Sequence, residues 1–333
     1  MDILLAHGYF LPLHAAEQRV MRPHPPLGLL YLSSHLKRRG VAVGIFHGTF
    51  RTLEDFSDTL ERERPPLVGI AVNLMTKRNA LKMIALAKRR GARVIIGGPD
   101  PPHHAESYLD AGADVVVIGE GEQTLEELIV ALRSLNADLS AINGIVFKGE
   151  DGKAIRTPAR ALLPDLDSQP YPDRDAIDLP RYLHAWRERH GTGTVSLITA
   201  RGCPYTCTWC SRSVFGETHR RRSVGNVADE VEGIVDRYHP ERLWYADDVF
   251  AIHRTWTISY AQELERRRIR LPFECISRAE RIDDDVAAAL ASLGCFRVWI
   301  GSESGTQRFL DAMKRKVSLD QVRDTARRLR RHG

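Results

Sequence analysis

Residues 194–211 read TVSLITARGCPYTCTWCS, and they place a strand directly before a group of three cysteines. The run Val195–Ala200 is short, mostly apolar and rich in β-branched residues, which predicts a buried strand. Cys203, Cys207 and Cys210 follow it with C-x-x-x-C-x-x-C spacing. In parallel α/β folds, functional groups gather at the carboxyl ends of strands. We therefore expect a binding site on this loop and βα units around it.

Four βα units are predicted over residues 191–333. The predicted strands are Val195–Ala200, Arg242–Ala246, Phe273–Ser277 and Phe296–Gly301, and the predicted helices are Val227–Tyr238, Trp256–Arg267, Asp283–Leu293 and Leu319–Arg331. Such a series is half of a closed (β/α) barrel. The sequence thus predicts a partial barrel that is truncated after its fourth unit, as a fragment or as a chain completed by a partner. The strand that ends at Gly301 should then be an exposed parallel edge.

Residues 1–140 show a similar alternation, which predicts a second domain with a doubly wound, Rossmann-like parallel sheet. Its predicted strands are Asp2–Ala6, Val41–Phe46, Leu67–Val72, Arg93–Gly97 and Asp114–Ile118, and its predicted helices are Gly28–Arg39, Lys77–Arg90 and Thr124–Leu135. Such a sheet binds a cofactor-sized ligand at the carboxyl edge of its strands. Residues 141–190 predict a β-hairpin over Ile142–Phe147 and Ala154–Thr157, followed by a proline-rich linker.

The composition is that of a globular protein, with 43% hydrophobic and 27% charged residues. The net charge of +5 reflects arginine clusters at Arg220–Arg222, Arg266–Arg268 and Arg327–Arg331. We interpret them as solvated helix faces, because no nucleic-acid-binding signature accompanies them, and a nucleic acid partner is not expected. No apolar run is long enough to span a membrane, and the first residues do not form a signal peptide, which predicts a cytoplasmic protein.

The cysteine group predicts a metal centre. Three thiolates on one loop can bind three irons of a 4Fe–4S cluster and leave the fourth iron open. A structural zinc site, the alternative, usually has four protein ligands, so His219 would have to reach back to this loop. Cys275 and Cys295 lie in or beside strand patterns, and we expect them to pack in the core.

The motif resembles the C-x-x-x-C-x-aromatic-C motif of the radical S-adenosylmethionine superfamily, with Trp209 as the aromatic residue. The resemblance implies that Cys203, Cys207 and Cys210 hold a 4Fe–4S cluster whose open iron binds the amino and carboxylate groups of S-adenosylmethionine. It also implies that one electron, from an external donor of the flavodoxin or ferredoxin type, cleaves this molecule to a 5′-deoxyadenosyl radical.

Polar residues after the later strands resemble stretches with which the superfamily approaches S-adenosylmethionine. Asp247 follows the second strand of this half, Arg278 the third, and Glu303 and Ser304 the fourth. By that resemblance they bind S-adenosylmethionine together with Trp209. Carboxylates suit its ammonium group and ribose hydroxyls, and an arginine suits its carboxylate. The alternative is that acidic residues such as Glu303 only cap the following helix.

Three stretches of residues 1–140 look like the cobalamin-binding domain that precedes many radical S-adenosylmethionine enzymes. They are PLGLLYL at 26–32, GGPD at 97–100 and GEGE at 119–122. The resemblance implies that Asn73, Gly97, Gly98, Gly119 and Gly121 bind the corrin, although turn chemistry would explain any one loop. The Asp-x-His-x-x-Gly motif of many cobalamin domains is missing, so we expect cobalamin without a protein histidine ligand.

Together these resemblances imply a cobalamin-dependent methyltransferase that acts on an unactivated carbon of a small-molecule or natural-product substrate. A radical cyclase or rearrangement enzyme with the same cofactors is one alternative. An RNA-modifying methylthiotransferase and a non-catalytic zinc-binding regulator are two others. The methylthiotransferase would need further cluster cysteines before residue 203, and the sequence has none there.

Overall fold

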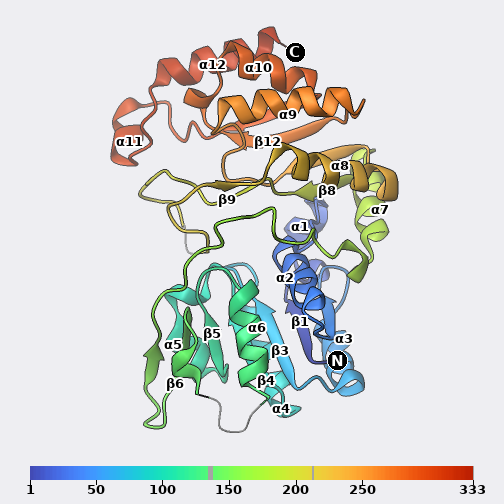
Figure 1. Cartoon of the computed structure of the whole chain (residues 1–333), viewed down its shortest axis with the longest axis vertical. Helices are drawn as coiled ribbons and strands as arrows, with labels where there is room; N and C mark the ends of the chain where they lie inside the picture. The colour runs from blue at the N-terminus through green and yellow to red at the C-terminus, as the bar shows by residue number, and fades with distance from the viewer. Residues whose placement is uncertain (134–137, 212–213, 333) are drawn as a thin grey trace. The chain divides into compact units, whose positions relative to one another are not determined.

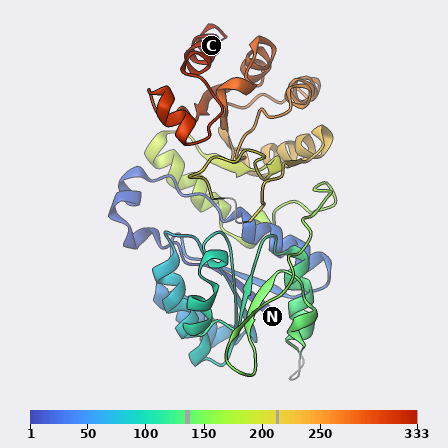
Figure 2. The same cartoon turned by 90° about the vertical axis from the view of Figure 1, so that its left-hand side faces the viewer.

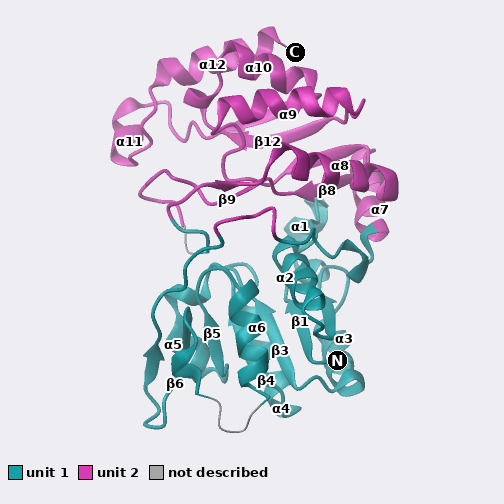
Figure 3. Cartoon of the chain, viewed as in Figure 1, with its two compact units in different colours: residues 1–163, 169–179, 213–216 teal, residues 164–168, 180–212, 217–333 magenta. Residues whose placement is uncertain are grey.

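The computed structural model describes residues 1–133, 138–211 and 214–332, and the chain divides into two compact units (Figures 1 and 3). Unit 1 comprises residues 1–163, 169–179 and 213–216, and unit 2 comprises residues 164–168, 180–212 and 217–333. The proline-rich segment predicted as a linker therefore contributes residues to both units. Among the described residues, no helix is both long enough and apolar enough to cross a membrane.

Unit 1 contains a seven-stranded sheet with the order β2-β1-β3-β4-β5-β6-β7. The strands are β1 Ile3–His7, β2 Val43–His47, β3 Leu67–Ala71, β4 Arg93–Gly97, β5 Val115–Val117, β6 Ile145–Lys148 and β7 Ala154–Arg156. The pairs from β2 to β5 are parallel. Strands β6 and β7 form the predicted hairpin, in which β6 pairs antiparallel with β5 and β7 pairs antiparallel with β6. The order 2-1-3-4-5 is that of flavodoxin-like folds, which bind ligands where the strand order reverses, between β1 and β3.

Helices cover both faces of this sheet, which confirms the doubly wound prediction. The helices of unit 1 are α1 Ala15–Val20, α2 Leu27–Arg38, α3 Leu53–Glu63, α4 Lys77–Arg89, α5 Ala105–Asp110 and α6 Glu122–Ala131. Apolar residues of α3, α4 and α5 form one core with the sheet, and those of α2 and α6 form another. Helices α1, α3 and α5 were not predicted from the sequence, and the end of the predicted helix Thr124–Leu135 lies outside the described residues.

Unit 2 contains a four-stranded parallel sheet with the order β13-β12-β11-β8. Its strands are β8 Thr194–Leu197, β11 Arg242–Tyr245, β12 Phe273–Ser277 and β13 Cys295–Ile300, and its helices are α7 Leu179–His190, α8 Val224–Tyr238, α9 Arg254–Arg266, α10 Asp284–Ser292, α11 Gln307–Ala312 and α12 Leu319–Arg331. Helices α8, α9, α10 and α12 pack side by side in that order (Figure 2, gold to red). The partial barrel is confirmed, and β13 forms the predicted edge of the sheet within the described chain.

Two details of unit 2 differ from the predictions. The predicted strand Val195–Ala200 is broken, and its end forms a short antiparallel pair between β9 Ala200–Arg201 and β10 Arg220–Arg221. The interpretation of Arg220–Arg222 as a solvated helix face is wrong, because the side chains of Arg221 and Arg222 are each 5% exposed. The other two clusters do lie at the surface, where the side chains of Arg266 and Arg331 are each 68% exposed.

Candidate functional site

The three cysteines of the motif lie on an irregular loop between β9 and β10 of unit 2. Cys207 is buried, Cys203 is half-buried and Cys210 is exposed. Burial raises the pKa of the Cys203 thiol, and the nearby Asp248 and Cys210 add to the shift. Within the described ranges, no three His, Cys, Asp or Glu side chains converge as they would around a single metal ion. Three thiols on one loop are the donor set that iron–sulfur clusters use.

The sulfur of Cys207 accepts hydrogen bonds from two guanidinium groups. Nη1 of Arg278 and Nη1 of Arg315 each lie 3.6 Å from Cys207 Sγ. Arg278 is 2% exposed and Arg315 is 8% exposed. Hydrogen bonds from cationic donors are stronger than those from neutral ones, and metal-bound cysteine sulfur carries negative charge. The arrangement therefore fits a cluster ligand at Cys207.

Arg278 is held by further contacts on each side of its guanidinium group. Its Nε donates to Glu280, its Nη2 donates to the carbonyl of Arg315, and its plane stacks on the ring of Tyr205 at 3.7 Å. A guanidinium group with these partners has a fixed orientation toward the cysteine loop. Arg278 was predicted from the sequence, whereas Arg315 was not, because it lies in the Lys-Arg-Lys run 314–316 and no local pattern marks it as buried.

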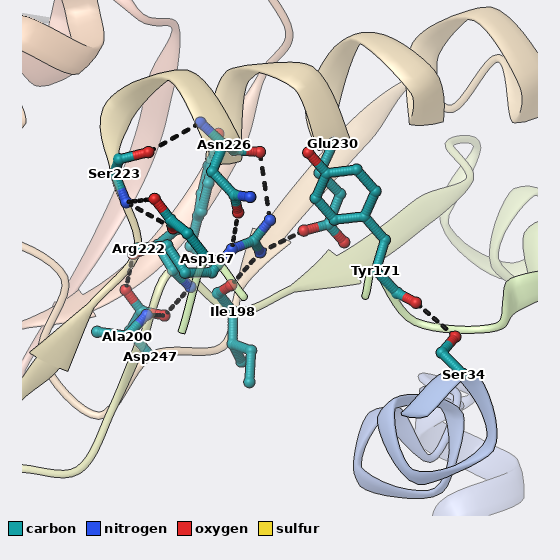
Figure 4. A network of polar contacts seen from close by, with 12 residues as sticks. Ser34, Asp167, Tyr171, Ile198, Ala200, Arg222, Ser223, Asn226, Glu230 and Asp247 are labelled. Atoms are coloured by element: carbon teal, nitrogen blue, oxygen red, sulfur yellow. Dashed lines mark hydrogen bonds and ion pairs between the residues drawn. The ribbon is translucent and has the colours of Figure 1, made fainter. Parts of the chain in front are cut away.

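Asp247 holds the backbone just before the cysteine loop (Figure 4). Its Oδ1 accepts hydrogen bonds from the Thr199 amide at 2.6 Å and the Ala200 amide at 3.2 Å, and its Oδ2 accepts the Thr199 hydroxyl. Arg221 Nη2 lies 3.6 Å from the same carboxylate. Asp247 is 2% exposed. These bonds account for the break after β8, and they give the carboxylate a role in shaping the turn that leads to Cys203.

A second polar network fixes the β9–β10 pair against α8 (Figure 4). Arg222 pairs with Glu230, donates to Asn226 Oδ1 at 2.6 Å and donates to the Ile198 carbonyl at 2.9 Å. Arg222 and Glu230 are 5% and 3% exposed. Because buried charges are tolerated only when they are paired and hydrogen-bonded, this network rigidly connects the helix to the root of the cysteine loop.

Of the other residues predicted to bind S-adenosylmethionine, Trp209 lies on the loop and Glu303 near it, whereas Ser304 makes a local contact. Trp209 is 56% exposed on the loop itself. Glu303 has a left-handed φ of 55°, and its Oε1 lies 4.0 Å from Arg315 Nη2. Ser304 Oγ accepts the amide of Thr306 at 3.1 Å. The structure thus brings Glu303 together with Cys207 through Arg315, while the carboxylate of Asp247 faces the turn before the loop.

The residues predicted to bind a corrin lie at the carboxyl edge of the unit 1 sheet. Gly98 has a φ of +109°, and a Cβ there would lie 2.5 Å from the Val72 carbonyl, so only glycine fits. Gly119 also has a positive φ of +82°, while Gly97 and Gly121 do not adopt that conformation. The side chain of Asn73 accepts the Thr76 amide at 3.0 Å, which closes the turn that precedes α4.

Directly after Asn73, the same edge exposes two apolar side chains. Leu74 is 80% exposed and Met75 is 55% exposed. At the neighbouring end of β1, Nδ1 of His7 is buried without a hydrogen-bond partner among the described residues. Burial lowers the pKa of His7 to about 4, and His47 adds to the shift. The edge therefore combines exposed apolar surface with a neutral histidine, which suits a large, mostly apolar ligand.

Two family profiles match the chain. Residues 18–129 match the family described as B12 binding domain, and residues 197–333 match the Radical SAM superfamily. The chain therefore belongs to the radical S-adenosylmethionine proteins that carry a B12-binding domain, as the cysteine motif and the strand-end loops indicated.

Individual proteins agree with this family. The chain is 29% identical over 330 residues to an uncharacterized methyltransferase of Pyrococcus horikoshii, covering 97% of this chain and 70% of that protein. It is 26% identical over 347 residues to the anaerobic magnesium-protoporphyrin IX monomethyl ester cyclase of Rubrivivax gelatinosus, covering 100% of this chain and 61% of the cyclase. The fold matches the structure of the cobalamin-dependent S-adenosylmethionine radical enzyme OxsB with a TM-score of 0.83 and 20% identity, over 98% of this chain and 47% of OxsB. The chain thus spans only part of the length of each of these proteins.

Proposed function

We propose that this chain binds a 4Fe–4S cluster and cobalamin and uses S-adenosylmethionine to methylate an unactivated carbon of a small-molecule or natural-product substrate. Cys203, Cys207 and Cys210 would hold the cluster. When bound, the two cofactors would supply the electron that cleaves S-adenosylmethionine and the carrier for its methyl group. The electron would come from a flavodoxin- or ferredoxin-type donor in the cytoplasm.

The residues of unit 2 would position S-adenosylmethionine rather than react with it. Trp209, Glu303 and Ser304 would line its site, and Arg278 would form the side of that site next to Cys207. Asp247 would act through the turn at Thr199, because its carboxylate oxygens already accept hydrogen bonds there. In unit 1, Asn73, Gly97, Gly98, Gly119 and Gly121 would form the corrin-facing edge.

The observation that carries the proposal is the convergence of two buried guanidinium groups on one of three thiols of a single loop. A structural zinc loop has no need of such cations, because its fourth protein ligand completes the site. A cluster with three thiolate ligands leaves excess negative charge on the sulfurs, which buried arginines stabilise.

Anaerobic reconstitution with iron, sulfide and hydroxocobalamin tests the proposal. We expect cluster absorbance, retained corrin and formation of 5′-deoxyadenosine from S-adenosylmethionine under reducing conditions. The variant Cys207→Ala should lose the cluster, whereas the matched variant Cys295→Ala, outside the loop, should keep it. Binding of zinc without iron and sulfide would refute the proposal, and a cluster without corrin would remove cobalamin-dependent methylation from it.

A radical cyclase is the second candidate, because the match to the magnesium-protoporphyrin IX monomethyl ester cyclase covers the whole chain. The two reactions differ in the fate of the methyl group of S-adenosylmethionine. If the methyl group of S-adenosylmethionine is isotopically labelled, methyl transfer predicts that the label appears in the corrin extracted from the reacted protein. A cyclase would form 5′-deoxyadenosine and leave the corrin unlabelled.

A further inference from the structure

The three motif cysteines differ in burial and in contacts, and the residues that cause this difference lie far from the loop in the sequence. Cys207 alone of the three is buried, at 4% exposure. Arg278 follows β12, and Arg315 lies between α11 and α12, yet each places Nη1 at 3.6 Å from Cys207 Sγ. Two elements of the fold thus present N–H donors with a positive charge to one sulfur.

We propose that Arg278 and Arg315 set the reduction potential of the cluster by donating N–H···S bonds to Cys207. This inference rests on the proposed function, since it requires the cluster. Hydrogen bonds to cysteine sulfurs, together with charge and exposure, determine the potentials of iron–sulfur clusters. An added electron increases the negative charge on the ligand sulfurs, so cationic donors stabilise the reduced cluster more than the oxidised one. The two arginines therefore raise the potential and make reduction easier.

Neighbouring carboxylates offset part of the charge of both arginines. Glu280 pairs with Arg278, and Glu303 Oε1 lies 4.0 Å from Arg315 Nη2. Long-range attraction is therefore reduced, and most of the effect comes from the direct N–H···S bonds, which are strong because their donors are charged. In this arrangement the donors work through contact with one sulfur rather than as a diffuse positive field.

The backbone of unit 2 fixes Arg315 in this position. Its Nη2 donates to the carbonyl of Gly301, and a Cβ on Gly301 would lie 2.6 Å from that same nitrogen. Gly301 at the end of β13 therefore leaves the space through which the guanidinium group reaches Cys207. A lysine at position 315 would keep a charge but would lose the planar fork that serves both partners.

The electron balance of the step is simple. One electron enters the cluster from an external low-potential donor, and no bond to either arginine forms or breaks. Both guanidinium groups remain protonated throughout, because arginine does not lose its proton in proteins. The effect is therefore on an equilibrium, the ratio of reduced to oxidised cluster at a given applied potential.

The experiment is a potentiometric titration of the reconstituted full chain without S-adenosylmethionine, followed by electron paramagnetic resonance of the reduced cluster. Arg315→Gln should lower the ratio of reduced to oxidised cluster at least tenfold at a fixed potential, or about 59 mV for a one-electron couple. Arg315→Lys should fall between Arg315→Gln and the unmodified protein. The matched control is Arg281→Gln, because Arg281 donates to the Tyr205 hydroxyl on the same loop and not to a sulfur.

Equal potentials in Arg315→Gln and Arg281→Gln would overturn the inference. If Arg315→Gln binds no iron, resonance Raman spectra of the unmodified protein in H2O and D2O decide instead. Exchangeable N–H···S bonds should shift the iron–cysteine stretching bands in D2O, and unshifted bands would refute the proposed bonds. Failure of the unmodified chain to bind iron and sulfide would instead refute the proposed function, so the two failures are distinguishable.

Discussion

Replacement of Asp247 by asparagine tests whether this residue supports the cysteine loop or binds a cofactor directly. The carboxylate is 2% exposed and accepts hydrogen bonds from the Thr199 amide and hydroxyl and from the Ala200 amide. It also lies 3.6 Å from the buried Arg221. Asparagine keeps the shape and one acceptor oxygen, but its amide group would face the Thr199 hydroxyl, to which Arg221 Nη1 already donates at 3.1 Å.

The expected cost follows from these contacts. The substitution weakens charge-assisted hydrogen bonds and leaves a buried guanidinium group without its counter-ion, and breaking a buried ion pair costs about 3–5 kcal/mol. Because Arg221 keeps the carbonyls of Val249 and Phe250 as acceptors, we take the lower end, about 3 kcal/mol. For a unit of this size, such a loss lowers the melting temperature by roughly 6–12 °C.

The assay is calorimetry of the full chain before reconstitution, followed by iron analysis afterwards. Asp247→Asn should melt earlier and retain less iron, because the turn before Cys203 is no longer held. The matched control is Asp248→Asn, which removes the same charge from an exposed neighbour and should change stability by about 0.5 kcal/mol or less. The reasoning would be refuted if Asp247→Asn had an unchanged melting temperature and iron content but bound S-adenosylmethionine more weakly.

Two further predictions concern unit 1. Gly98→Ala should destabilise the chain by about 1–3 kcal/mol and weaken corrin retention, because Gly98 has a φ of +109° and a Cβ there would meet Val72. The control is Gly28→Ala in helix α2, where a Cβ would meet nothing within 4 Å, so this variant should be neutral or stabilising. Equal melting temperatures of the two variants would contradict the expected strain at Gly98. The folded-state pKa of His7 is lowered to about 4 from 6.5, so the unfolded chain takes up this proton first and stability falls as the pH drops from 6.5 toward 4. Between pH 7.5 and 5 the free energy of unfolding should fall by about 2 kcal/mol because of His7. Urea unfolding of His7→Asn should show a smaller fall over the same pH range. An unchanged pH dependence in this variant would disprove the assignment of the effect to His7.

Local patterns were enough to predict the sheets of both units. Short, mostly apolar runs predicted the bounds of β4 and β12 correctly, as Arg93–Gly97 and Phe273–Ser277. Helix α3 was missed because its apolar face is narrow, with only Phe56 and Leu60 as buried apolar residues on a helix rich in acidic side chains. Its start is nevertheless marked by a capping box at Thr52, a signal that the sequence does contain.

The candidate site was predictable only where one segment carries it. The cysteines form a local motif, and their position after a strand follows from the βα pattern. Arg315 could not be found in this way, because it lies 108 residues from Cys207 in the sequence, in a basic run typical of solvent-exposed surface. The break after β8 was missed for a similar reason, since it depends on Asp247, 48 residues away from Thr199.

The shape of the cysteine loop is thus determined by residues of the later βα units. Asp247 fixes its beginning at Thr199, and the Thr208 amide in its middle donates to the Met313 carbonyl at 3.1 Å. Arg278 and Arg315 meet at Cys207. Together these contacts join the loop to the segments that follow three strands of the sheet, β11, β12 and β13. The segment beyond β13 is therefore part of the cysteine site, because without it Cys207 would lose one cationic donor and much of the cover that keeps it from solvent.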